Sequence, residues 1–169
     1  MQHWQWVVLI GNLLGCIACA SVFDQEIKRQ VNPKISFASL SQDPEAQIGQ
    51  VIILAGIIIE ATNLEDITRL IVLQYPTDSR DRPKTDKPSG GRFLIRAPGY
   101  LETALYSPNR VVTVLGEIRE PEILPLGDTY YTYPVIEPRE IHLWPQDYET
   151  PRVRFNFGIG FGIGTGRYY

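Results

Sequence analysis

The stretch Gly49–Thr62, Gly-Gln-Val-Ile-Ile-Leu-Ala-Gly-Ile-Ile-Ile-Glu-Ala-Thr, is the longest β-branched apolar run in the chain. Within it, Val51–Ile59 is apolar without alternation, which predicts a strand that is covered on both faces. Gly56 in mid-strand predicts a bulge or sharp bend, as where a strand turns the corner of a barrel. We therefore expect this stretch to be the opening strand of a small β-barrel, with later strands pairing against it.

Further apolar runs bounded by glycine, proline and polar residues predict the remaining strands. These runs are Ile67–Tyr75, Arg92–Ala97, Arg110–Ile118, Tyr130–Ile136 and Arg139–Trp144. Gly99–Tyr106 predicts a short helix or helical turn, and residues 120–128 predict a connecting loop. Together these elements predict an all-β domain over residues 46–146, with five or six strands and one short helix. This order resembles the partly open barrel of the OB-fold, with another small antiparallel barrel or sandwich as the alternative.

The composition excludes several classes of site. A chain of 169 residues with a net charge of -3 predicts one domain without a bias toward polyanions such as nucleic acid. The two cysteines, Cys16 and Cys19, both lie near the N-terminus, so the body has no disulfide framework and no thiolate metal site. With only His3 and His142 as histidines, a zinc site is not expected either. We therefore expect no metal and no cofactor.

The N-terminal region has the pattern of an export signal. Residues 1–23 contain no Asp, Glu, Lys or Arg. The apolar run Trp4–Leu14 is too short to span a hydrocarbon core, which needs about 20 residues. It suits the apolar region of a secretory signal, although only Met1-Gln2-His3 precedes it in place of a positively charged region.

The end of this region, Leu13-Leu14-Gly15-Cys16-Ile17-Ala18-Cys19-Ala20-Ser21, resembles the lipobox of bacterial lipoproteins. The resemblance implies cleavage before a cysteine that carries acyl chains such as palmitate. Cys16 has the better local match, but cleavage there leaves Cys19 as a free thiol in an oxidising compartment. We favour Cys19, with residues 1–18 as the signal peptide, and keep Cys16 and an uncleaved anchor as alternatives. Neither cysteine precedes aspartate, which by resemblance favours the outer membrane.

Three other segments flank or interrupt the predicted strands. Residues 19–45 are expected to be a tether that leads into the barrel, with a helical turn at Phe23–Lys28 and a short strand or extended arm at Ser36–Leu40. Thr77–Gly91 carries charges of both signs, which favours a solvated loop over a contact with headgroups. The tail, residues 147–169, alternates glycine with apolar residues, which places its side chains on one face when extended. It is interpreted as flexible, as a strand added to a sheet edge, or as an interfacial membrane contact.

Tyr131 and Tyr133 are the candidate binding residues, because they share one face of a predicted strand. In an OB-like barrel, exposed aromatic side chains bind extended ligands, so a glycan, lipid or envelope protein would suit this face better than nucleic acid. Packing of the same tyrosines in the core or rim is the alternative. His142, between Ile141 and Leu143, is interpreted as a structural or surface residue. The carboxylates considered for an acid–base pair are Asp43, Glu45, Glu60, Glu65 and Asp66. Most of them fall at turns or strand ends, so no catalytic residues are expected.

The order of these motifs resembles the Slp family of outer-membrane lipoproteins, which are associated with starvation and stationary phase. The resemblance covers roughly residues 15–150, and rests on the lipobox, the Gly49-Gln50-Val51 strand and three later stretches. Those stretches are Gly91–Glu102, Arg110–Ile118, and Tyr133–Ile136 with Ile141–Trp144. The resemblance implies a lipid-anchored, periplasm-facing module that is structural or binds a ligand or partner, and is not an enzyme. An envelope hydrolase, or an accessory subunit of one, is the alternative.

Overall fold

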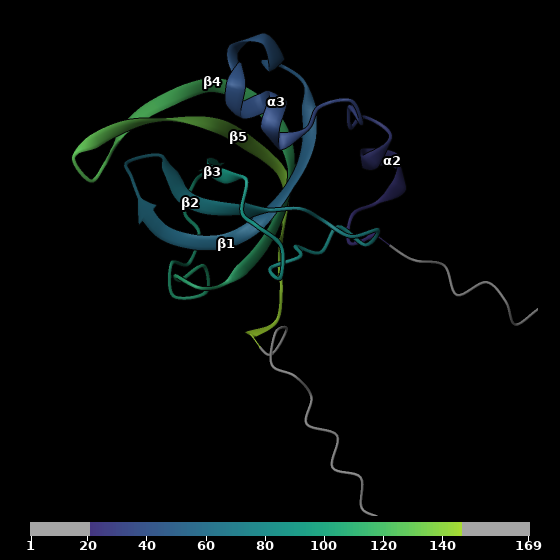
Figure 1. Cartoon of the computed structure of the whole chain (residues 1–169). Helices are drawn as coiled ribbons and strands as arrows, with labels where there is room; N and C mark the ends of the chain where they lie inside the picture. Colours follow the sequence, from purple (N-terminus) through teal and green to yellow (C-terminus); the bar gives the residue numbers. More distant parts are fainter. Residues whose placement is uncertain (1–20, 147–169) are drawn as a thin grey trace, which may run out of the picture.

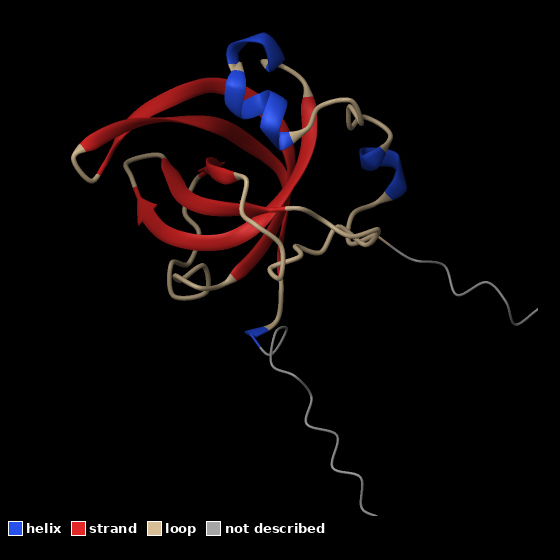
Figure 2. Cartoon of the chain, in the orientation of Figure 1, coloured by secondary structure: helices blue, strands red, loops and turns tan. Residues whose placement is uncertain are grey.

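A computed structural model describes residues 21–146, and five strands form most of this part of the chain (Figure 2). The strands are β1 (Val51–Asn63), β2 (Ile67–Tyr75), β3 (Gly91–Pro98), β4 (Val111–Leu126) and β5 (Thr129–Leu143). They close into a barrel in the order β1-β2-β3-β5-β4 (Figure 1). Every neighbouring pair is antiparallel except β3 and β5, which are parallel at Leu94–Val135. The predicted OB-like barrel is therefore confirmed.

The core of the barrel follows from the alternation of side chains along the strands. In β2, every second residue is buried, and the buried set is Thr68, Leu70, Val72 and Gln74. From β1, Ile52, Leu54 and Ile58 belong to the main core cluster, together with Val112 and Val114 of β4. Residues on the other face of β1 are also largely covered, as the unbroken apolar run predicted.

Gly56 is needed for close packing within the barrel wall. A Cβ atom built on it would lie 2.0 Å from the carbonyl oxygen of Leu73, so no larger residue fits without movement of the β2 backbone. The irregularity in β1 lies two residues further on, where the register with β2 shifts between Ile58 and Glu60. Gly56 is thus where the β1 and β2 backbones approach closely, and the bulge lies two residues further along β1.

The prediction of a loop at residues 120–128 is wrong, because β4 continues to Leu126 and β5 begins at Thr129. The two strands predicted at Tyr130–Ile136 and Arg139–Trp144 are joined in one strand, β5. Pro121 and Pro134 both fall where the β4–β5 register shifts between Arg119 and Glu122. Pro138 lies beside the second shift, between Leu115 and Gly116. Bulges tolerate residues that cannot donate to the ladder, so these prolines do not end the strands.

The segment before the barrel packs against it. Its helices are α2 (Gln25–Lys28), α3 (Phe37–Gln42) and the 3-10 helix η1 (Glu45–Gln47), of which α2 confirms the predicted helical turn. The strand or arm expected at Ser36–Leu40 is instead the start of α3. Ser36 caps it, with its hydroxyl accepting from the N–H of Ser39. Phe37 and Leu40 enter the core cluster, so α3 covers one end of the barrel (Figure 1).

Hydrogen bonds and burial describe two further segments, one before β1 and one between β3 and β4. Between β3 and β4, the chain forms a helical turn in which the N–H of Tyr106 donates to the carbonyl of Glu102 at 3.1 Å. In the segment expected to be a tether, Phe23 is 3% exposed and packs with Val51 and Leu115. Within the described residues, the chain from Phe23 onward is therefore attached to the barrel, because burial of Phe23 and Phe37 stabilises it there.

Candidate functional site

The predicted tyrosine face packs against the barrel. The rings of Tyr131 and Tyr133 lie 4.6 Å apart in an edge-to-face arrangement, which confirms that they share one face of β5. Tyr133 is 1% exposed and forms a hydrophobic cluster with Leu94 of β3 and Val135. It therefore has no surface left for a ligand.

The same packing covers the outer face of β3. Tyr131 is half-buried, and its hydroxyl accepts a 3.2 Å hydrogen bond from the N–H of Arg92. Arg96 of β3 forms an ion pair with Glu122 of β4. Residues 119–135, called here the β4–β5 ribbon, thus lie against this face through both apolar and ionic contacts. The expectation of a binding face at both tyrosines is corrected at Tyr133, since the ribbon folds back onto β3.

The opposite face of the ribbon is exposed. Ile123 pairs with Thr132, and Pro125 pairs with Tyr130, so these four residues share one side of the ribbon. Ile123 is 66% exposed and Tyr130 is 74% exposed. The exposed aromatic residue of this strand is therefore Tyr130. The sequence contained this signal, since Tyr130 lies on the face opposite Tyr131 and Tyr133.

Asp81 connects three segments that are distant in sequence. Its carboxylate accepts a 2.8 Å hydrogen bond from Nζ of Lys28 and another from the hydroxyl of Ser21. Its backbone carbonyl accepts from Oγ1 of Thr113 at 2.9 Å, and Thr113 in turn accepts from Nε1 of Trp144 at 2.9 Å. The charged loop at residues 77–91 is thus held over the outer face of β1 and β4.

The candidate lipidation residues Cys16 and Cys19 lie outside the described residues. Ser21, two residues after Cys19, is the first described residue and is already bonded to Asp81.

The surroundings of His142 and Asp78 shift the pKa values of these side chains. His142 stacks edge-to-face on Trp144 at 4.4 Å; burial lowers the pKa of His142, and nearby Glu140 opposes that shift. Burial tends to raise the pKa of Asp78, but the N–H groups of Arg82 and Arg80 outweigh it and hold that pKa below its usual value. Over residues 21–146, no group of three or more His, Cys, Asp or Glu side chains could hold a metal ion.

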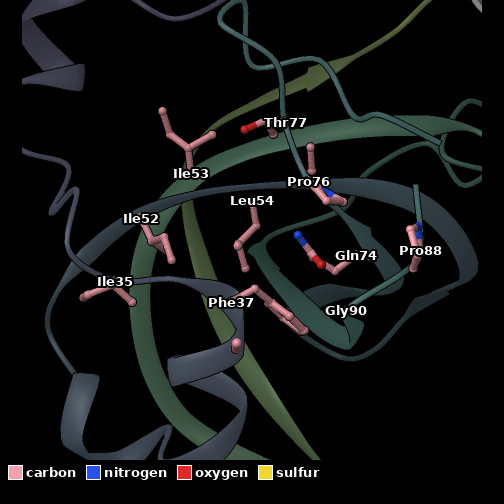
Figure 3. Close-up of a pocket in the computed structure, with 12 residues that line it drawn as sticks. Ile35, Phe37, Ile52, Ile53, Leu54, Gln74, Pro76, Thr77, Pro88 and Gly90 are labelled. Atoms are coloured by element: carbon pink, nitrogen blue, oxygen red, sulfur yellow. The ribbon is translucent and has the colours of Figure 1, made fainter. Parts of the chain in front are cut away.

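A pocket of about 380 Å³ opens beside β1, and no motif in the sequence pointed to it directly (Figure 3). Phe37 and Leu54 line it, and the side chain of Gln74 reaches into it between them and Gly90 (Figure 3). The remaining lining residues are Ile35, Ala38, Ile52, Ile53, Ala55, Pro76, Thr77 and Pro88. A polar residue on the inward-facing side of a predicted strand, Gln74, was the available signal.

Two known proteins are similar to this chain over most of its length. The chain is 29% identical over 138 residues to the outer membrane protein Slp of Escherichia coli, which covers 80% of this chain and 73% of that protein. It is 27% identical over 140 residues to an uncharacterized protein of Haemophilus influenzae, with coverage of 82% and 74%.

One solved structure has a weak likeness to the barrel. The small single-stranded DNA-binding protein of Streptomyces coelicolor superposes with a TM-score of 0.35 and 11% identity, over 56% of this chain and 94% of that protein. A likeness at that level says nothing about the ligand of this chain.

No helix in residues 21–146 has the length and apolar character needed to cross a bilayer. The family model described as "Outer membrane lipoprotein Slp family" matches residues 16–163 of this chain. This range includes both candidate cysteines, the whole barrel and much of the tail. The resemblance seen in the lipobox and the strand motifs is thereby confirmed. The chain belongs to the outer membrane lipoprotein Slp family and is a protein of the outer membrane.

Proposed function

We propose that the chain is a non-enzymatic lipoprotein, anchored by acyl chains on Cys19, whose barrel faces the periplasm and binds an envelope partner during starvation or other stress. The observation that carries this proposal is the docking of Ser21 on Asp81. Two residues of extended chain span only about 7 Å, so an anchor at Cys19 would hold the barrel directly at the bilayer surface. Cys16 remains the alternative anchor, and two or more acyl chains suffice for stable attachment at either position.

The charged loop supports this orientation. Asp81 brings residues 77–91 beside the start of the described chain, and Arg80, Lys84 and Lys87 in this loop are exposed. The loop also contains Asp78 and Asp86, and Asp86 pairs with Lys87, so its net charge is small. The short connection from Ser21 to Cys19, and not a strong charge attraction, would place the loop near the lipid headgroups when the anchor is inserted.

The ion pairs of the barrel support a role without catalysis. Arg119 lies between Glu117 and Glu137, with contacts of 2.6 Å to each, and Glu122 pairs with Arg96. These carboxylates are neutralised by neighbouring arginines, whereas a hydrolase needs a carboxylate or histidine free to exchange a proton with substrate. The alternative of an envelope hydrolase has no comparable structural support.

The partner surface that the geometry favours is the exposed side of the β4–β5 ribbon. Tyr130 and Ile123 project from it, and exposed aromatic residues are enriched among the residues that dominate binding at protein interfaces. A protein of the envelope therefore fits this surface better than a glycan or a free lipid. A photo-crosslinking residue at Tyr130 in cells should capture such a protein, while the same residue at Ser79 in the membrane-proximal loop should not.

Mass spectrometry of the mature protein tests the anchor. The N-terminal peptide should begin at an acylated cysteine; Cys19→Ser should abolish this form, and Cys16→Ser should leave it intact. The reverse pattern would move the anchor to Cys16. Recovery of an unmodified chain beginning at Met1 would refute lipid anchoring. Protease added to intact cells should leave the barrel uncut, and cleavage under these conditions would contradict the periplasmic orientation.

A further inference from the structure

The pocket in Figure 3 lies at a gap in the pairing of β1. β4 pairs with β1 from Val51 onward, but β2 pairs with β1 only from Ala55 onward. On the β2 side, the carbonyl of Val51 accepts a 2.9 Å hydrogen bond from the N–H of Asn32. Between these contacts, no strand of the described residues pairs with Ile53 on that side.

The backbone of Ile53 points into this gap. Along a strand, alternate residues direct their N–H and C=O groups to the same side. Gln50 directs its carbonyl to Ile118 of β4, whereas Val51 directs its carbonyl away from β4. The N–H and C=O of Ile53 therefore point away from β4, as do those of Val51 and Ala55, and they face the pocket. Such a pair of groups matches the backbone of an added peptide.

Gln74 adds a second polar group to the same pocket. The residue is 8% exposed, and its amide reaches into the pocket (Figure 3). A glutamine amide offers two donors and an acceptor, so Gln74 can hydrogen-bond a ligand inside the pocket. A peptide that hydrogen-bonds this amide would therefore gain a polar contact beside the one at Ile53.

The shape and lining of the pocket limit what this partner can be. A volume of about 380 Å³ lies at the small end of ligand pockets, which range from roughly 300 to 1,000 Å³. Phe37, Ile35 and Leu54 supply apolar walls beside the two polar groups. Because the gap is one hydrogen-bonding residue wide, an inserted chain needs small residues on both sides of its apolar residue. A glycine–apolar–glycine peptide meets this requirement.

We propose that the pocket binds the C-terminal tail of the same chain, through Gly158-Ile159-Gly160 or Gly160-Phe161-Gly162. The tail residue would pair its backbone with Ile53 and the Gln74 amide, and place its side chain against Phe37. These triplets lie inside the part of the chain that matches the family.

The tail is long enough to reach the pocket. Trp144 is bonded to Thr113, which pairs with Ala55 at the pocket wall, so the described chain ends near this side of the barrel. From Gln146, the twelve residues to Gly158 span up to about 40 Å when extended.

Cysteine pairs in the full-length protein, kept in its membrane, test the proposal. Ala38 is exposed at the pocket rim, and Tyr130 is exposed on the distant ribbon. Under mild oxidation, Ala38→Cys with Ile159→Cys should form an intramolecular disulfide about tenfold faster than Tyr130→Cys with Ile159→Cys, because docking raises the effective concentration. Equal rates, or a product of dimer size only, would overturn docking within one chain.

A second measurement separates the role of the amide from general folding. Gln74→Leu keeps the side-chain size but removes the hydrogen bonds, so it should slow the Ala38–Ile159 crosslink several-fold. The matched variant Gln42→Leu, on the exposed side of α3, should not change the rate. Circular dichroism should show both variants folded. An unchanged rate in folded Gln74→Leu would refute the assigned role of this amide.

Discussion

Nζ of Lys28 in α2 lies 2.8 Å from the carboxylate of Asp81, which is 53 residues further along the chain. Asp81 has a φ of 63° and is 7% exposed, so the loop backbone adopts a left-handed conformation to place this carboxylate inside the structure. This ion pair joins the start of the described chain to the β2–β3 loop, and through Thr113 to the barrel wall.

Asp81→Asn should weaken the attachment of the N-terminal segment to the barrel, while the buried Phe23 stays packed. Asparagine tolerates the left-handed conformation, so the change removes the charge without adding backbone strain. Loss of charge-assisted hydrogen bonds should lower the free energy of unfolding by about 1.5–3 kcal/mol, measured by urea denaturation. Asp86→Asn is the matched control. Its side chain is 72% exposed beside Lys87, so the stability should change by less than about 0.5 kcal/mol.

Gly56→Ala should destabilise the barrel, because the added Cβ would lie 2.0 Å from the Leu73 carbonyl oxygen. Overpacking of this kind costs about 1–3 kcal/mol or more, which a thermal melt would detect as a lower Tm. As a comparison, Gly127→Asn introduces a side chain at a φ of 60°, with no atom within 4 Å of the new Cβ. That variant should melt close to the wild type. A wild-type Tm for Gly56→Ala would contradict the close approach of β1 and β2.

Tyr133→Ala should cost about 3–5 kcal/mol, as expected for removal of a buried aromatic side chain. Tyr130→Ala, at a residue that is 74% exposed, should leave the stability within about 0.5 kcal/mol of wild type. Chemical denaturation of both variants distinguishes a packing residue from a surface residue. If Tyr133→Ala proved neutral, the cluster with Leu94 would not hold the ribbon.

His142 should make the protein less stable as the pH falls through 6.5. Burial lowers the pKa of His142 in the folded state, so below the unfolded value of about 6.5 the unfolded chain binds more protons. The loss of stability should level off once the pH is below the folded pKa. His142→Gln should flatten this part of the profile between pH 7.5 and 5.5, as measured by denaturation at each pH. A slope that persists in the variant would have to come from another group.

The first three strands were predictable almost to the residue. Ile67–Tyr75 coincides with β2, and Arg92–Ala97 lies within one residue of each end of β3. Their alternating or continuous apolar runs end at turn residues or proline, and the local pattern was decisive. In the β4–β5 ribbon, prolines suggested breaks that do not occur. A sequence does not show that a proline will fall at a bulge, because a bulge depends on the register of the partner strand.

The candidate site, like the fold, was predictable from the sequence only in part. Strand alternation correctly placed Tyr131 and Tyr133 on one face, but exposure of that face depended on Leu94 and Glu122, which approach only when the ribbon folds onto β3. Likewise, the inward direction of Gln74 follows from the strand period. The gap beside Ile53 follows only from where β2 stops pairing with β1.

The sequence by itself determined the all-β class, the two candidate cysteines and the family resemblance, since each rests on residues close together in the chain. It favoured an OB-like barrel over a sandwich, and the strand pairing then showed the closed barrel. Only the tertiary structure decided that Asp81 receives Lys28, that Tyr133 is buried and Tyr130 exposed, and that a pocket opens at Ile53. The physical reason is that these features depend on contacts between segments tens of residues apart. Burial and pairing of a polar group are set by what the fold brings next to it.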